Sequence, residues 1–202
     1  MSGNDITRMD PVGRWEPDAA GRLAQAALEL YAERGFEQTT VLDIAERAGV
    51  TERTFFRHFA DKREVLFDRS NTLQEGVVAA IAAAPADLPP LEVVGTAMEQ
   101  AGVFLDDRRT YALQRSAAIA ANPSLQEREL LKMAHLAAAV TAALRARGVP
   151  APAAGVAAQA GVAVFRLAFE RWVFNPASVP FASCVRDTLA ELRALAAPPP
   201  AS

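Results

Sequence analysis

Helix-favouring residues fill nearly every segment of this chain. Alanine and leucine dominate, while the alternation of β-branched and polar residues that is typical of strands is missing. Glycine and proline fall between these segments rather than inside them. The chain is therefore predicted to be all-α, with a first helix that begins after Asp18, a good N-cap residue, and ends at Gly35.

Proline and glycine also mark the helices that follow. After two short helices, a long one is predicted from a capping box of Asp61 and Glu64 through Leu73 to Ala84, because Pro85 then breaks the chain. Further helical runs are expected at residues 91–105, 108–121, 124–147, 153–174 and 180–197. A compact N-terminal unit followed by a larger helical bundle is the simplest division of this pattern.

The composition limits the possible chemistry. A net charge of −3 excludes a polybasic tail or a generally cationic coat for nucleic acids. The single cysteine, Cys184, excludes an internal disulfide and a multi-cysteine zinc site, and two histidines, His58 and His135, do not suffice for a histidine-rich metal centre. We therefore expect no cofactor, no metal and no catalytic residue.

Export and membrane insertion are not expected either. The first ten residues are polar and acidic, whereas a secretory signal requires a basic start and an apolar run, so a cytoplasmic location is predicted. Residues 148–165 carry no formal charge and reach the length of a membrane span. Glycine, proline and glutamine interrupt this stretch, which therefore predicts a buried helix after a proline-rich turn and no contact with a membrane.

The most informative segment covers residues 39–59. Thr40 and Asp43 form a capping box for one short helix, Gly49 supplies the left-handed residue of a tight turn, and Thr51 caps a second short helix. Small or apolar residues have the spacing to fill the core between the two helices: Ile44, Ala45, Val50, Phe55 and Phe59. This arrangement predicts a helix-turn-helix.

The second of these helices has an unusual exposed face. Because Phe55 and Phe59 lie one turn apart and face inward, Glu52, Arg53, Phe56 and Arg57 fall on the other side. Such side chains can read a major groove: Arg53 can donate to guanine, Glu52 can accept from cytosine, and Phe56 can pack on a thymine methyl group. Arg57 can instead reach a phosphate. The alternatives are that Phe56 is a second core aromatic, that His58 is structural and that Lys62 is a surface lysine.

Residues 17–66 resemble the N-terminal domain of the TetR family of bacterial transcriptional regulators. The likeness rests on a series of spacings across a quarter of the chain: Tyr31-Ala32-Glu33-Arg34-Gly35-Phe36, Thr39-Thr40-Val41, Ile44-Ala45, Ala48-Gly49-Val50-Thr51, Thr54-Phe55-Phe56-Arg57-His58-Phe59 and Lys62. The resemblance implies a DNA-binding helix-turn-helix domain of three helices over residues 1–67. It also implies an effector-binding and dimerisation domain, a larger helical bundle, over residues 68–202.

The resemblance further implies a homodimer that binds double-stranded DNA at a near-palindromic operator. It assigns Thr40 to a phosphate, and Thr51, Glu52 and Arg53 to positions nearest the bases. It assigns phosphate-backbone contacts to three more residues: Thr54, His58 and Lys62. Many family members have tyrosine in place of Phe56, so an apolar base or sugar contact is expected there. Arg8 and Arg14 precede the first helix. They belong either to an arm that lies over the DNA phosphates or in the minor groove, or to a solvated, disordered N-terminal segment.

In the larger domain we expect a small-molecule effector site of polar groups within apolar helix runs. The candidates are Met98, Phe104, Tyr111, Arg115, His135, Gln159, Arg166 and Phe169. Each also has a structural interpretation, such as a core histidine at His135 or an ion pair of Arg166 with Glu170. The two C-terminal helices are candidates for the dimer interface, through Ala157, Ala160, Val164, Leu167 and residues 189–195, although burial within one subunit explains them almost as well.

The sequence is compatible with three functions. The leading one is a transcriptional regulator, most simply a repressor released from its operator by a small-molecule effector. The alternatives are a dimeric ligand-binding module without operator binding, and a small helical enzyme. Against the enzyme, Cys184 has no histidine near it in sequence, neither histidine has a metal-binding spacing, and no phosphate-binding glycine loop occurs. Residues 1–75 carry ten basic and fourteen acidic residues. DNA affinity is therefore expected to depend on a local cluster of cations rather than on a broad positive field.

Overall fold

The computed structural model describes residues 18–67, 69–175 and 179–197, except for the side chains at positions 69, 70, 101 and 104. All regular structure in these residues is helical, which confirms the all-α prediction. The elements are α1 (Ala19–Arg34), α2 (Val41–Arg47), α3 (Glu52–His58), the 3₁₀ turn η1 (Glu64–Leu66), α4 (Arg69–Ala83), α5 (Pro90–Gly102), the 3₁₀ turn η2 (Val103–Arg108), α6 (Arg109–Ala120), α7 (Pro123–Ala146), α8 (Ala151–Phe174) and α9 (Phe181–Ala196).

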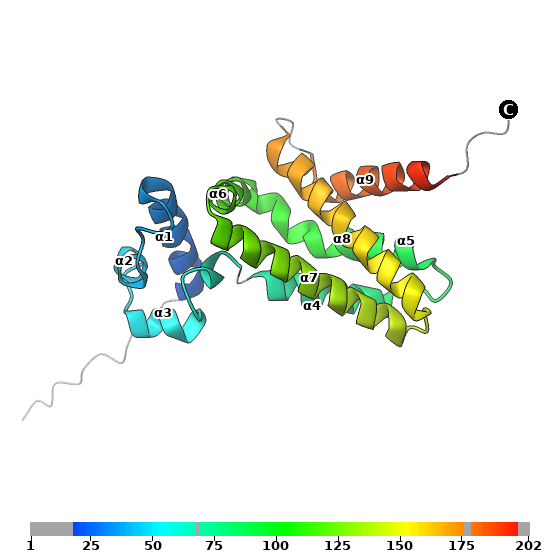
Figure 1. Ribbon diagram of the computed structural model, residues 1–202, viewed down its shortest axis with the longest axis horizontal. Coiled ribbons are helices and arrows are strands. Elements are labelled where there is room, and N and C mark those ends of the chain that lie inside the picture. Colours follow the sequence, from blue (N-terminus) through cyan, green and yellow to red (C-terminus); the bar gives the residue numbers. More distant parts are fainter. Residues whose placement is uncertain (1–17, 68, 176–178, 198–202) are drawn as a thin grey trace, which may run out of the picture.

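The helices form two groups, as Figure 1 shows: α1 to α3 lie at one end, and α4 to α9 form a larger bundle beside them. Each group has its own apolar core. The core of the N-terminal group also takes in Ile119 from α6 and Leu125 from α7. The corner between α6 and α7 therefore packs into the N-terminal group, and the boundary predicted after residue 67 falls between η1 and α4.

The predicted first helix is confirmed at both ends. Asp18 precedes α1 and its carboxylate accepts a hydrogen bond of 2.9 Å from the backbone N–H of Gly21. Gly35 ends the helix at φ 83°, in the region that favours glycine. Between them, Leu23, Ala27 and Tyr31 are buried in the N-terminal core.

The long helix predicted from Asp61 to Ala84 is wrong. The chain forms only the short turn η1 before α4 begins. The Nε atom of Arg115 donates 2.7 Å to the carbonyl of Leu66, an acceptor that a continuous helix would use for its own backbone bond. Glu64 does not complete a capping box, because its carboxylate pairs with Arg128 and Lys132 of α7.

Glycines also lie inside helices, contrary to the expectation that they only separate them. Gly161 is in the middle of α8, where an added Cβ atom would come within 2.1 Å of the Cγ1 atom of Val94 on α5. The missing side chain therefore lets α8 and α5 pack closely. Among the described helices, α8 is long and apolar enough to cross a membrane by length and composition, but here it packs against α5, α7 and α9 as a core helix does.

Candidate DNA-binding surface and effector pocket

The helix-turn-helix forms from local caps and one glycine turn. Thr40 caps α2 through its bond from the Asp43 N–H, and the Asp43 carboxylate accepts from the Thr40 N–H at 2.8 Å. At the other end, Gly49 has φ 69°, and the Val50 N–H donates 2.9 Å to the carbonyl of Ala45. This is the hydrogen-bond pattern of a helix end with a left-handed glycine, and it turns the chain directly into α3.

A small aromatic core fixes α3 against α1 and α2. Phe55 is fully buried, and its ring lies 5.6 Å from the ring of Phe59. Ile44 and Ala45 are buried on the α2 side, and Val50 packs against the same cluster. The core predicted from the sequence is therefore confirmed, and it decides which face of α3 points outward.

The outward face of α3 carries Glu52, Arg53, Phe56, Arg57 and His58, all of them exposed. The side chain of Phe56 is 55% exposed, which excludes the alternative that it is a second core aromatic. Within the described residues, Arg53 makes no hydrogen bond or ion pair, and Arg57 contacts His58 at 3.4 Å. Both guanidinium groups are therefore available to an external acceptor.

The other arginines near this face are engaged by carboxylates. Arg34 pairs with Asp43 at 2.7 Å, and Arg47 makes a bidentate contact with Glu33 at 2.9 and 2.8 Å. These exposed pairs stabilise the fold only slightly. They do set Arg53 and Arg57 apart as the arginines of the helix-turn-helix that no carboxylate of the described residues engages.

Lys62 does not fit the predicted role as a phosphate contact. Its ammonium group donates to three backbone carbonyls, at 2.9 Å to Phe36, 3.0 Å to Thr39 and 3.4 Å to Glu37. It also lies 4.3 Å from the centre of the Phe36 ring. Because an ammonium has three N–H groups, Lys62 uses all of its donors to hold the segment between α1 and α2.

The threonines at the two helix starts act first as caps. The hydroxyl and the backbone N–H of Thr40 both donate to Asp43, so the predicted bond from Thr40 to phosphate requires the capping box to open. Thr51 accepts from the N–H of Thr54, and the two hydroxyl oxygens lie 3.1 Å apart. Only one of these two hydroxyl groups donates to the other. The second hydroxyl proton can therefore be donated to an external acceptor.

The capping carboxylate gives the helix-turn-helix a defined pH dependence. Hydrogen bonds from the side chain and backbone of Thr40, and then from Arg34, lower the pKa of Asp43 from 3.8 to about 2. A lowered pKa in the folded state means that the stabilisation is present above the unfolded value and is lost as the pH falls towards 2.

We therefore predict that Asp43→Asn lowers stability at neutral pH and that its difference from the wild type vanishes between about pH 4 and about pH 2. Urea unfolding midpoints across this range measure it. Asp87→Asn, at an exposed aspartate before α5, serves as the control. A constant difference between wild type and Asp43→Asn at every pH would contradict the assignment.

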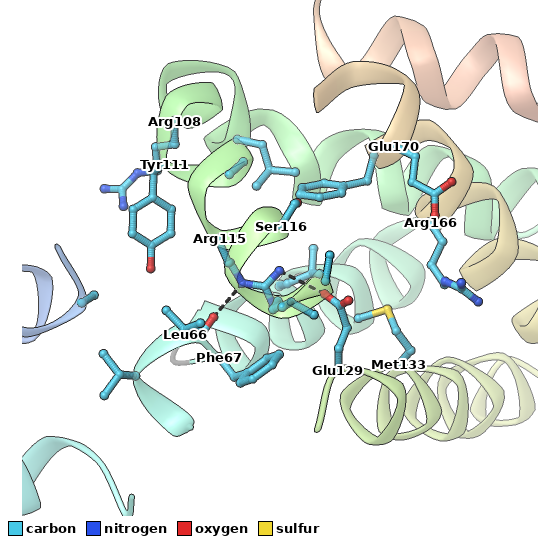
Figure 2. Close-up of a pocket in the computed structure, with 18 of the residues that line it drawn as sticks. Leu66, Phe67, Arg108, Tyr111, Arg115, Ser116, Glu129, Met133, Arg166 and Glu170 are labelled. Carbon is cyan, nitrogen blue, oxygen red and sulfur yellow. Dashed lines mark hydrogen bonds and ion pairs between the residues drawn. The ribbon is translucent and has the colours of Figure 1, made fainter. Parts of the chain in front are cut away.

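A pocket of about 680 Å³ lies where the two groups of helices meet. Of the predicted effector residues, four line it: Tyr111, Arg115, Arg166 and Phe169. Figure 2 shows Tyr111 and Arg115 on α6, with Arg166 on α8. Within the described residues, Arg166 and Glu170 do not form the alternative ion pair.

The other predicted effector residues do not line this pocket. Met98 is fully buried in the core of the bundle, whereas His135 and Gln159 are exposed on the outer faces of α7 and α8. Their apolar neighbours in sequence suggested burial, but these residues lie on the solvent side of their helices. The side chain of Phe104, and Arg8 and Arg14, lie outside the described residues.

The sequence did not indicate the pocket residues that come from the N-terminal group and from α7. They include Gly21, Gln25, Phe67, Glu129 and Met133. Glu129 pairs with Arg115 at 3.0 Å. These contacts join parts of the chain that are distant in sequence, so no local pattern could have indicated them.

Residues 23–68, which contain the whole helix-turn-helix, match the model of a family described as bacterial regulatory proteins of the tetR family. The helix-turn-helix of this chain is therefore a TetR-family domain. It is 43% identical over 76 residues to the transcriptional regulator TcmR of Streptomyces glaucescens, and 40% identical over 58 residues to the repressor KstR2 of Mycobacterium tuberculosis. These matches cover 38% and 29% of this chain, and only 34% and 29% of the two relatives.

Solved structures of TetR-like proteins extend the likeness to the whole fold. FadR of Bacillus subtilis, solved in complex with stearoyl-CoA, matches with a TM-score of 0.60 and 18% identity over 85% of this chain and 96% of its own. A transcriptional regulator from Rhodococcus matches with a TM-score of 0.50 and 26% identity over 85% of this chain and 94% of its own. The bundle α4 to α9 therefore has the fold of these regulators.

Proposed function

We propose that this chain is a cytoplasmic transcriptional regulator of the TetR family whose α3 enters the major groove of an operator. The observation that carries this proposal is the exposed face of α3, where Arg53 and Arg57 have no carboxylate partner among the described residues beside an exposed Phe56. Exposed guanidinium groups on a short, well-capped helix fit direct reading of guanine. The names of the curated relatives, transcriptional regulators and a repressor, support the same conclusion.

Two copies of α3 are needed for a near-palindromic site, so we propose that the regulator is a homodimer. The outer face of α8 carries exposed apolar side chains, with Val156 72%, Leu167 50% and Phe174 67% exposed. Leu195 of α9 is 85% exposed. Ala157, Val164 and Leu189, also considered for the interface, are buried within the subunit, so the contact is assigned to the exposed residues instead.

A charge on this face should separate the subunits. We predict that Leu167→Asp converts the dimer to a monomer in sedimentation experiments and weakens operator binding, because a carboxylate would be buried between apolar faces. Leu130→Asp is the matched control, since Leu130 is an exposed leucine on α7 with 59% exposure. A Leu167→Asp protein that remains dimeric would contradict the assignment of α8.

We propose that the pocket between the two groups of helices holds a small-molecule effector that releases the operator. The pocket combines apolar and aromatic walls with a few charged groups, as ligand sites commonly do. The stearoyl-CoA complex of FadR supports a small-molecule role for this fold. An effector acts only through different affinities for the DNA-bound and DNA-free arrangements of the dimer.

Titration of the purified protein against its own upstream DNA tests the proposed function. If each subunit neutralises about three phosphates, the affinity should fall about 10³-fold between roughly 50 and 200 mM salt. Binding that is insensitive to salt, or equal for unrelated duplexes, would count against an operator-binding regulator.

A ligand-binding dimer without operator binding is the second candidate. The acidic excess in residues 1–75 and the commitment of Lys62 to backbone carbonyls favour it. Its signature is a protein that small molecules stabilise but that retains no DNA above background in any duplex pool.

A further inference from the structure

Residues of the N-terminal group, which carries the proposed DNA-binding surface, form part of the pocket wall. The pocket walls include Gly21 and Gln25 of α1 and Val65 and Leu66 of η1, together with residues of α6, α7 and α8. A molecule bound there would contact the helices that position α3 as well as the larger bundle. A bound molecule can therefore change the position of α3 through these direct contacts as well as through α4.

Arg115 lies at the centre of this junction, between Leu66 and Glu129 (Figure 2). Its Nε donates 2.7 Å to the Leu66 carbonyl, and its Nη1 donates 3.0 Å to Glu129. The guanidinium carbon also lies 4.9 Å from the centre of the Phe67 ring. The side chain is only 19% exposed, and these contacts hold η1 against α6 and α7.

The two polar contacts of Arg115 differ in their acceptors, a neutral carbonyl at Leu66 and a carboxylate at Glu129. A neutral carbonyl accepts less strongly than a carboxylate does. Nη2 makes no hydrogen bond within the described residues, so the guanidinium has donors left for an acceptor in the pocket. An anion that binds these donors from the pocket pulls the guanidinium towards itself and so draws Nε away from the Leu66 carbonyl.

The walls indicate what kind of molecule carries that anion. Five aromatic side chains line the pocket: Phe67, Tyr111, Phe165, Phe169 and Phe174. Three of the charged lining residues already have partners: Asp18 caps α1, and Glu129 pairs with Arg115. The other charged lining residues, Arg108, Arg166 and Glu170, make no hydrogen bond or ion pair within the described residues. The uncommitted charges therefore favour an anion, and the rings favour an apolar molecule that contains rings.

We propose that the pocket takes an apolar, ring-containing molecule with one anionic group, which pairs with Arg115 and weakens its bond to Leu66. The inference rests on the proposed function, since it describes how an effector would act. Leu66 belongs to the core that also holds Ile119 and Leu125. Loosening η1 thus changes how α1 to α3 are attached to the α6–α7 corner.

Two fluorescent probes with the same ring system test this proposal. 1-Anilinonaphthalene-8-sulfonate is an apolar aromatic anion, and N-phenyl-1-naphthylamine is its neutral counterpart. Affinities are measured by fluorescence for wild type, Arg115→Gln, Glu129→Gln and the control Arg145→Gln, which removes an exposed charge on α7 outside the pocket. Hydrogen exchange then follows the amides of Leu66 and Phe67, which donate to the carbonyls of Arg63 and Glu64 in η1.

For Arg115→Gln we expect an affinity for the anionic probe at least about tenfold weaker, with less than about a twofold change for the neutral probe. Glu129→Gln should bind the anion more tightly, because it removes the competing carboxylate while keeping the arginine. Arg145→Gln should match the wild type. In the wild type, the anionic probe should speed exchange in η1 about tenfold, and the neutral probe should leave it unchanged.

The proposal is overturned if Arg115→Gln and Glu129→Gln both bind the anion as the wild type does, or if the bound anion leaves exchange in η1 unchanged. Should Arg115→Gln fail to fold, Glu129→Gln and the exchange data from the wild type decide the matter. No step of this experiment uses DNA. Failure of operator binding would therefore overturn the proposed function, and failure of the probe experiment would overturn this inference.

Discussion

Replacing Arg53 and Arg57 together by alanine is expected to abolish sequence-specific DNA binding without unfolding the protein. Both side chains are exposed on α3, and no carboxylate engages them within the described residues, so their loss removes no internal ion pair. An arginine that pairs with a guanine edge contributes about 1–3 kcal/mol of discrimination. With two such residues in each of two subunits, we expect operator affinity to fall at least about 100-fold.

The measurement is fluorescence anisotropy with a labelled operator duplex at constant salt, with circular dichroism to verify the fold. Arg145→Ala is the control for loss of one positive charge, because Arg145 is exposed near the C-terminal end of α7 and does not belong to the helix-turn-helix. Operator affinity in the double variant equal to that of the wild type would show that α3 does not read DNA through these arginines.

Adjacent phenylalanines on α3 should respond very differently to the same substitution. Phe55 is fully buried among the rings and aliphatic side chains of the N-terminal core, so Phe55→Ala is expected to destabilise this group by about 3–5 kcal/mol. Phe56 is 55% exposed, and Phe56→Ala should change the free energy of unfolding by less than about 0.5 kcal/mol.

Urea unfolding followed by far-ultraviolet circular dichroism measures both variants, and operator binding adds a second readout. Phe55→Ala should lose binding because α3 is no longer held, whereas Phe56→Ala should lose only the contribution of an apolar contact with the DNA. Equal destabilisation by the two substitutions would mean that α3 does not present the face described here.

Local sequence patterns predicted the parts of the fold that local interactions determine. The caps at Asp18, Thr40 and Thr51 and the glycine turns at Gly35 and Gly49 lie within a few residues of the groups that they bond. The spacing of Phe55 and Phe59, one helical turn apart, likewise indicated that Phe55 is buried, which in turn exposes Arg53 and Arg57.

Contacts between distant residues decided the features that the sequence did not reveal. At the break before α4, the Leu66 carbonyl accepts from Arg115, 49 residues away, and the donors of Lys62 bond to carbonyls 23 to 26 residues earlier. His135 and Gln159 lie in apolar runs, yet they occupy the outer sides of α7 and α8. The walls of the pocket likewise come from α1, η1 and α6, which are distant in sequence and meet only in the folded chain.

The most direct test of the account is selection of DNA from a random duplex pool by the purified full-length protein. We predict a near-palindromic sequence with half-sites one helical turn apart, or a multiple of it, selected by the wild type and not by the Arg53→Ala, Arg57→Ala double variant. A pool that remains random after repeated rounds, although the protein is folded and dimeric, would contradict the claim that this chain is an operator-binding regulator.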